Sequence, residues 1–198
     1  MSVREFDIAD EAGHDFSEVE KCLGVSRRTF LNFCTGVAAS FGLGTKSALA
    51  MADAIANPGR IPVIWLHGQE CTGPTESLLR SEQPSFEHLI LDLISLDYHQ
   101  TLDAGAGHRV EEIKRETMKT YKGKYLLVIE GAIPTGQNGI FCKIGGQTMM
   151  DATKEAAEGA AAIVAFGSCA SWGGVQSASP NPTGATGAPQ FLKGKTVV

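Results

Sequence analysis

Three short apolar runs, each followed by a polar turn that contains glycine, set the pattern of this chain. They span residues 61–66, 125–130 and 162–166. Runs of this length and β-branched content, bounded by turns, predict buried strands. Because helical patterns stand between them, the sequence predicts an α/β fold with an open parallel sheet, right-handed crossovers and helices on both faces.

The segments between the runs predict the helices and the remaining strands. Pro74 stands in the first turn of a predicted helix over 74–79, a position that proline favours. Further helices are predicted over 86–94, 110–121 and 148–159, and residues 95–102 are compatible with a short strand. The glycine-rich segments 131–147 and 167–175 are predicted as strand-end loops, and residues 194–198 as the start of another strand.

The sequence predicts two regions. An N-terminal extension with an export signal covers residues 1–54, and the folded domain covers residues 55–198. Arg27 and Arg28 are followed by Phe30 and a weakly apolar segment, a pattern typical of a twin-arginine signal. Small residues between 48 and 56 offer cleavage positions. The alternative is an amphipathic N-terminal helix of the domain. The apolar segment is too short to predict a transmembrane helix, which needs about 20 apolar residues.

Composition narrows the classes of function. The chain has 198 residues, 43% of them hydrophobic, with 17 basic and 22 acidic side chains and a net charge of −5. This is enough for one α/β domain and an appendage. No basic stripe is present, so a nucleic-acid partner is not expected.

The five cysteines carry the candidate chemistry. Three of them, Cys71, Cys142 and Cys169, fall in the predicted domain, and an odd number argues against a simple disulfide framework. Cys71 and Cys169 each follow a predicted strand, so both are expected at the carboxyl edge of the sheet. Soft thiolates there favour zinc, copper(I) or an iron-sulfur cluster, whereas unpaired structural cysteines are an equal alternative.

Three sequence blocks carry a resemblance to a known family. WLHGQECTGPTESLLRS resembles the WxHxxECTGCxES signature of the small, electron-transferring subunit of [NiFe] hydrogenases, and EGAIPTGQNGIFCKIGG and AFGSCASWGGVQSA match the next two blocks of that family. The resemblance implies a flavodoxin-like domain that holds the [4Fe-4S] cluster nearest the nickel-iron centre of a large subunit. The twin-arginine leader implies the uptake, membrane-associated branch on the periplasmic side.

Carried over residue by residue, the resemblance assigns Cys71 and Cys169 as the first and third cluster ligands. Pro74 stands at the position of the second ligand, and the fourth is expected beyond Val198. Cys142 matches a position that is not usually a ligand. Since proline has no thiolate, the ligand set is incomplete, and we expect the isolated chain to hold no stable cluster and to be inactive.

The resemblance also implies partners. The chain is expected to act in H2 oxidation within a heterodimer, with a large subunit that carries the nickel-iron centre and with a membrane cytochrome b as a possible acceptor. By the same resemblance, the region for the family's other clusters is expected to be missing from this chain. Glu70 is expected at the subunit interface, either as a proton relay or as a helix-capping carboxylate, and His67 as an interface contact or an ordinary turn histidine.

Two alternatives come from other classes of function. CTGPTES is similar to a flavodoxin phosphate loop, in which hydroxyl and backbone N–H groups hold the phosphate of FMN. A cluster-free module that only binds a large subunit is the second alternative. Absorbance separates them, because a flavin gives a structured yellow band and an iron-sulfur cluster a broad brown one.

Overall fold

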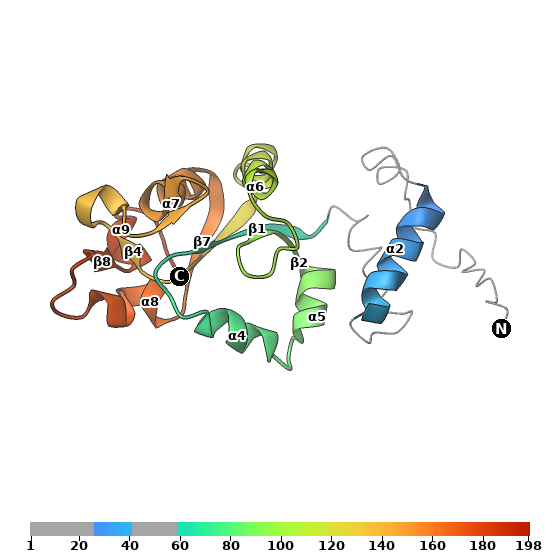
Figure 1. Cartoon of the computed structure of the whole chain (residues 1–198), viewed down its shortest axis with the longest axis horizontal. Helices are drawn as coiled ribbons and strands as arrows, with labels where there is room; N and C mark the ends of the chain where they lie inside the picture. The colour runs from blue at the N-terminus through green and yellow to red at the C-terminus, as the bar shows by residue number, and fades with distance from the viewer. Residues whose placement is uncertain (1–25, 41–58) are drawn as a thin grey trace. The chain divides into compact units, whose positions relative to one another are not determined.

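The computed structural model describes residues 26–40 and 59–198, and the chain divides into a unit of 1–59 and a unit of 60–198. In the first unit, helix α2 (Arg27–Ser40) begins with the two arginines of the predicted export motif (Figure 1). The backbone N–H of Thr29 donates to Ser26 Oγ at 3.3 Å, which satisfies one free donor at the helix start. The predicted cleavage positions and the boundary at residues 54 and 55 lie outside the described residues.

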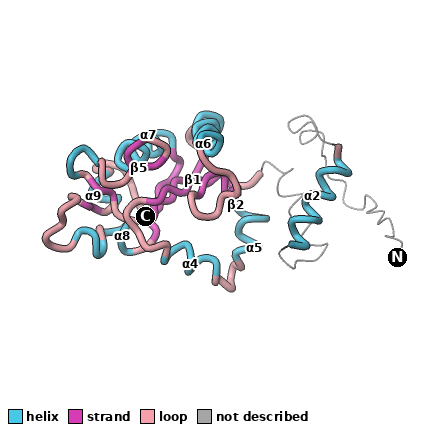
Figure 2. Tube along the Cα trace, in the orientation of Figure 1, coloured by secondary structure: helices cyan, strands magenta, loops and turns pink. Residues whose placement is uncertain are grey.

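The second unit is built on a four-stranded sheet of β1 (Ile61–His67), β2 (Ile94–His99), β3 (Tyr125–Glu130) and β7 (Ala160–Phe166). All pairs are parallel and the order is β2-β1-β3-β7 (Figures 1 and 2). These are the first four positions of the doubly wound order 2-1-3-4-5 of flavodoxin-like sheets. Next to β7, Val198 N donates to Ile163 O at 3.0 Å, so the last residues pair as predicted.

The helices and short elements connect these strands. The longer helices are α6 (His108–Thr120) and α7 (Met149–Gly159), and the shorter ones are α4 (Gly73–Leu79), α5 (Phe86–His88), the π-helical turn η1 (Leu89–Leu93), η2 (Gly136–Gly139), α8 (Ser168–Trp172), η3 (Gly174–Ser177) and α9 (Ala188–Phe191). Two small antiparallel pairs join β4 (Ile133–Pro134) to β8 (Ala185–Thr186) and β5 (Lys143–Ile144) to β6 (Gln147–Thr148). In the described segments no helix combines the length and the apolar character that crossing a bilayer requires.

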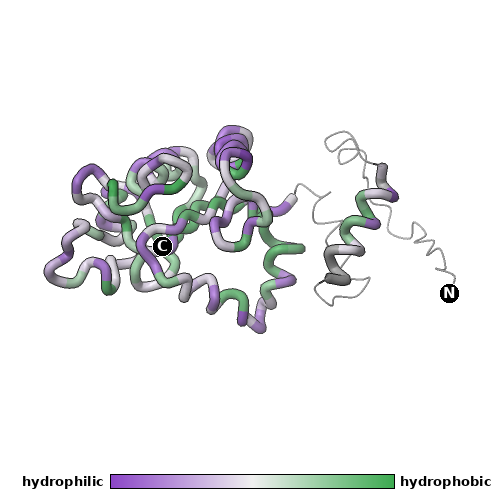
Figure 3. The backbone as a smooth tube through the Cα atoms, in the orientation of Figure 1, coloured by the Kyte–Doolittle hydropathy of each residue, from purple (hydrophilic) through white to green (hydrophobic). Residues whose placement is uncertain are grey.

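The core lies on both faces of the sheet because alternate strand residues point to opposite sides. Ile64 and Leu127 belong to the larger cluster, which α7 covers with Ala152 and Ala156. On the other face, a smaller cluster of Val63, Trp65 and Val128 packs against Leu78 of α4. Strand β1 is accordingly largely green in Figure 3, whereas α6 is mostly purple. The prediction of a parallel α/β sheet with helices on both faces is confirmed.

The predicted loops are wrong in part. Residues 167–175 contain α8 and the first two residues of η3, because Gly167, at φ 89° and ψ 166°, turns the chain directly from β7 into a helix. Residues 131–147 contain a hairpin whose two-residue turn, Gly145 and Gly146, has positive φ at both positions, as a type I′ turn requires. Glycine-rich segments suggest loops by composition, although here the glycines serve tight turns between ordered elements.

Candidate functional site

The two cysteines predicted as ligands lie in the segments that follow β1 and β7, at the carboxyl edge of the sheet. Cys71 is exposed in the turn after β1, Cys169 is half-buried in α8 after β7, and both are free thiols. The two segments meet through Pro74 and Gly167, since a Cβ added to Gly167 would overlap Pro74 Cγ. The parallel sheet therefore brings the two cysteine loops to one edge, although β3 lies between their strands.

Each sulfur of this edge lies against a glycine. A Cβ added to Gly73 would lie 3.1 Å from Cys71 Sγ, and one added to Gly174 would lie 2.6 Å from Cys169 Sγ. A [4Fe-4S] cluster takes four thiolates. At this edge the chain supplies two cysteines, and Pro74, where the resemblance implies another ligand, has no thiolate. The residues present do not fit a complete cluster site.

Cys142 does not complete the set of cluster ligands. Its side chain is half-buried and packs against the larger core cluster. Burial raises the pKa of the Cys142 thiol, and the negative charge of Glu70 raises it further. Iron binds the thiolate, so this environment opposes metal binding by Cys142.

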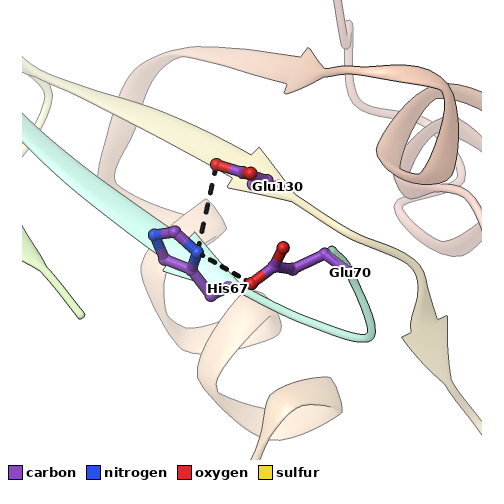
Figure 4. A group of neighbouring side chains, drawn as sticks. All are labelled: His67, Glu70 and Glu130. Atoms are coloured by element: carbon purple, nitrogen blue, oxygen red, sulfur yellow. Dashed lines mark ion pairs between the residues drawn. The ribbon is translucent and has the colours of Figure 1, made fainter. Parts of the chain in front are cut away.

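A second polar group lies beside the cysteines, at the ends of β1 and β3. Figure 4 shows the His67 ring with the carboxylates of Glu70 and Glu130 directed toward the same nitrogen. His67 Nδ1 lies 3.5 Å from Glu70 Oε1 and 3.9 Å from Glu130 Oε2. His67 is 6% exposed, Glu130 is fully buried and the Glu70 side chain is 14% exposed. Of these three residues, only His67 and Glu70 were singled out from the sequence.

Backbone pairing between the loops after β1 and β3 holds the group in place. The register of the two strands sets His67 opposite Glu130. Gln69 and Ala132 then exchange two N–H···O bonds of 2.9 Å. Gly131 lets the loops approach closely, because a Cβ there would lie 2.7 Å from Glu70 Cβ.

The carboxylate of Glu130 accepts three hydrogen bonds. Trp65 Nε1 donates to Oε2 at 3.0 Å, Thr75 Oγ1 donates to Oε2 at 2.5 Å, and Thr75 N donates to Oε1 at 3.2 Å. Since Thr75 N belongs to the first turn of α4, Glu130 is the carboxylate that meets this helix start. Glu70 accepts instead from the Thr72 hydroxyl at 3.2 Å.

His99 continues this network from the end of β2. Its Nδ1 accepts backbone N–H groups of Thr101 and Leu102 at 3.2 and 3.3 Å, so the proton of the neutral ring is on Nε2. Nε2 lies 3.4 Å from Thr75 Oγ1, which in turn donates to Glu130. Burial, together with the neighbouring His67, lowers the pKa of His99 to about 4. His99 is therefore neutral, and a directed chain runs from His99 through Thr75 to Glu130.

Comparison with known families identifies the family to which this chain belongs. The family described as NADH ubiquinone oxidoreductase, 20 Kd subunit, matches residues 71–198. The chain belongs to this family. Among curated proteins, the Hydrogenase-2 small chain of Escherichia coli (strain K12) is 51% identical over 175 residues, 88% of this chain and 47% of the relative.

Other relatives agree with this result. The Uptake hydrogenase small subunit of Rhizobium leguminosarum bv. viciae is 46% identical and covers 92% of this chain and 51% of its own length. The chain thus spans about half the length of these curated relatives. A [NiFeSe] hydrogenase chain from Desulfovibrio vulgaris Hildenborough superposes with a TM-score of 0.68 at 41% identity, over 72% of this chain and 53% of that chain. The predicted resemblance to hydrogenase small subunits is confirmed.

Sequence reasoning missed Glu130 and His99. The signal for Glu130 is an acidic residue that ends an otherwise apolar strand next to β1, and His99 ends β2 in the same way. Both residues reach the edge that holds Glu70. Of the two tryptophans, Trp65 is buried in the core, whereas Trp172 is 69% exposed.

Proposed function

We propose that this chain is the cluster-proximal part of a [NiFe] hydrogenase small subunit, which acts in H2 oxidation together with a large subunit. Membership of the family and the identity to hydrogenase small chains support this role. The nickel-iron centre belongs to the partner, so any activity belongs to the heterodimer, and the isolated chain is inactive.

The observation that carries the proposal is the meeting of the two cysteine loops through Pro74 and Gly167. In this proposal Cys71 and Cys169 are two thiolate ligands of an iron-sulfur cluster, and Pro74 replaces another. When bound, such a cluster supplies one-electron redox chemistry beside the partner's metals. The chain's own contribution is to hold two thiols at the carboxyl edge of its sheet.

Exposed apolar side chains at the same edge provide the surface for the large subunit. Trp172 and Val175, which follow β7, are 69% and 86% exposed, and Ile140 and Phe141, which follow β3, are also exposed. Large apolar residues exposed beside a functional edge are typical of a protein interface, in which tryptophan is enriched.

Glu70 has a proposed role at this interface. Its carboxylate lies between the exposed Cys71 and the buried His67, and its Oε2 is buried without a hydrogen-bond partner. We assign it as a relay for protons released by H2 oxidation. In an assembled enzyme, Glu70→Gln should slow proton-dependent turnover more than electron transfer to an artificial acceptor, and equal slowing of both would count against the relay.

The proposed location is the periplasmic side of the membrane, with export by the twin-arginine translocase and with a membrane cytochrome b as acceptor. Arg27 and Arg28 at the start of α2 support it. The double variant Arg27→Lys/Arg28→Lys should leave the protein in the cytoplasmic fraction. Unchanged export of this variant would refute the proposed route.

Co-purification tests the subunit role. The full chain, expressed with the large subunit of a [NiFe] hydrogenase, should be recovered in a one-to-one complex. Trp172→Lys should weaken this complex at least tenfold, whereas Ile61→Lys should not, because Ile61 is 53% exposed at the opposite end of β1. Absence of a complex, or equal weakening by both substitutions, would refute the proposed interface.

The flavin alternative is disfavoured by the geometry of the loop after β1. A phosphate loop needs free N–H and hydroxyl donors. Thr75 N and Oγ1 instead donate to the buried carboxylate of Glu130, and the Thr72 hydroxyl donates to Glu70. Two carboxylates at this position would repel a phosphate.

A further inference from the structure

We propose that His67, Glu70 and Glu130 form a binding site for a divalent transition-metal ion such as Zn²⁺, separate from the cysteines. One potential ligand atom from each of the three side chains lies within 4.8 Å of the others. In the segments that the structure describes, this is the one group of three or more histidine, cysteine or acidic side chains with such spacing.

The distances suit a small ion. Ligand atoms about 2.0–2.1 Å from a tetrahedral zinc ion are about 3.4 Å apart. The two measured separations, 3.5 Å from His67 Nδ1 to Glu70 Oε1 and 3.9 Å from His67 Nδ1 to Glu130 Oε2, are slightly larger. Small side-chain rotations would close them around an ion. The separations are too long for direct hydrogen bonds, so the group is not closed on itself.

Several buried polar atoms of this site have no hydrogen-bond partner. Both ring nitrogens of His67 are buried without a hydrogen bond, although the residue is only 6% exposed. Glu70 Oε2 is buried without a partner as well. A buried polar atom without a partner costs about 1–3 kcal/mol. An ion held by His67 Nδ1 and the Glu70 carboxylate gives a partner to atoms on two of the three side chains.

The charges of the two carboxylates also favour a bound divalent cation. Glu130 is fully buried and Glu70 is mostly buried, and among the ion pairs of the described residues only His67 brings a basic side chain to them. With a neutral imidazole, two carboxylates at this spacing leave two negative charges unbalanced, which is costly in a buried site. A divalent cation balances both charges, whereas a proton on His67 balances one.

Hydrogen bonds from neighbouring residues orient the two carboxylates, as they do for the ligands of metal sites. Trp65 Nε1 and Thr75 Oγ1 hold Glu130 in one orientation, and the Thr72 hydroxyl holds Glu70. Such second contacts orient ligating carboxylates in metal sites. Imidazole with carboxylates suits Zn²⁺, Mn²⁺ or Fe²⁺ rather than the soft ions that thiolates select. The Glu70 side chain, 14% exposed, offers the route of entry.

This site goes beyond the proposed hydrogenase role and does not depend on it. While an ion is bound, Glu70 is a ligand and cannot relay protons, so metal binding and proton relay are alternative states of the same carboxylate. Metal binding can be measured on the full chain without a large subunit, which keeps its failure distinct from failure of the proposed function.

The test is Mn²⁺ binding to the chelator-treated full chain, followed by electron paramagnetic resonance, with Zn²⁺ as competitor. Mn²⁺ is the direct probe because thiolates bind it poorly, so the cysteines contribute little. We expect about one Mn²⁺ per chain, displaced by about one Zn²⁺, and an affinity at least roughly tenfold lower in His67→Gln and in Glu70→Gln.

The matched control is His88→Gln, which removes a solvent-exposed histidine that lies 2.6 Å from Asp92. It should bind Mn²⁺ like the unaltered chain. Glu70→Gln is isosteric at a partly exposed position, so it keeps the test valid if His67→Gln fails to fold. Absence of stoichiometric Mn²⁺ binding, with water or a proton alone filling the site, would overturn the proposal, as would equal binding by Glu70→Gln and the unaltered chain.

Discussion

The ring of Pro74 fills the space that a side chain on Gly167 would need, and this contact joins the loops after β1 and β7. Gly167 has φ 89° and ψ 166°, a region that essentially only glycine occupies. The contact and the backbone conformation therefore constrain residue 167 independently.

Gly167→Ala should destabilise the domain by about 2–3 kcal/mol, from backbone strain together with overlap with Pro74. The control is Gly146→Ala, because Gly146 also has positive φ, 83°, but has open space around its Cβ position. It should cost about 1 kcal/mol. Urea unfolding measures both free energies, and similar losses would mean that the Pro74 contact has no energetic weight. Pro74→Ala should recover part of the loss in Gly167→Ala.

The cysteines should differ in reactivity. Cys71 is exposed, whereas Cys142 is half-buried and burial and Glu70 raise the pKa of its thiol. Because the thiolate is the reactive form, iodoacetamide near neutral pH should modify Cys71 well before Cys142. Peptide mass spectrometry resolves the two rates. Glu70→Gln should speed modification of Cys142 without changing Cys71 comparably, and no change at Cys142 would contradict the influence of Glu70.

Lys114 and Glu111 form the buried ion pair of α6. Lys114 Nζ lies 2.5 Å from Glu111 Oε2, and Tyr98 donates to Glu111 Oε1 at 2.7 Å. Lys114→Met should cost about 3 kcal/mol, because it leaves the Glu111 carboxylate buried without its cation. The exposed pair of Arg109 and Glu112 is the control, and Arg109→Met should change the free energy of unfolding by less than about 0.5 kcal/mol. Equal effects would show that Lys114 is solvated in solution.

Thr75 links His99 to Glu130, and its hydroxyl should matter more than its methyl group. Thr75→Val removes the O–H that Glu130 accepts at 2.5 Å and should cost about 1–3 kcal/mol. Thr75→Ser keeps that donor and loses one buried methyl group, for about 1 kcal/mol. Thermal or urea unfolding compares them. A valine variant as stable as the serine variant would rule out an energetic role for the hydroxyl.

Apolar patterning predicted the sheet well and the polar contacts poorly. The bounds of β3 follow from YLLVIE, and β1 was predicted to within one residue, because buried parallel strands are continuously apolar. The π-helical turn η1 and the helix α8 depend on tertiary packing and on turn geometry that local composition does not encode. Glu130 joins the site only because the register of β1 and β3 sets it opposite His67, which no local pattern specifies.

For the predicted cluster ligands, too, the sequence predicted some features and not others. The motifs placed Cys71 and Cys169 at the carboxyl edge of one sheet, and the fold brings their loops together. Pro74 stands where the resemblance implies another ligand, and it fits the start of α4 and packs against Gly167. Its ring is compatible with the helix and the fold, so neither the helix pattern nor the parallel sheet could single out position 74, which only the resemblance does.

Iron and sulfide content after anaerobic reconstitution and desalting tests the central claim most directly. The account predicts that the unaltered chain retains far less than the roughly four iron and four sulfide of one cluster, that Pro74→Cys retains more, and that adding Cys71→Ser or Cys169→Ser removes this gain. Retention of roughly four iron and four sulfide by the unaltered chain, or a gain in Pro74→Cys that survives loss of Cys71 and Cys169, would contradict it.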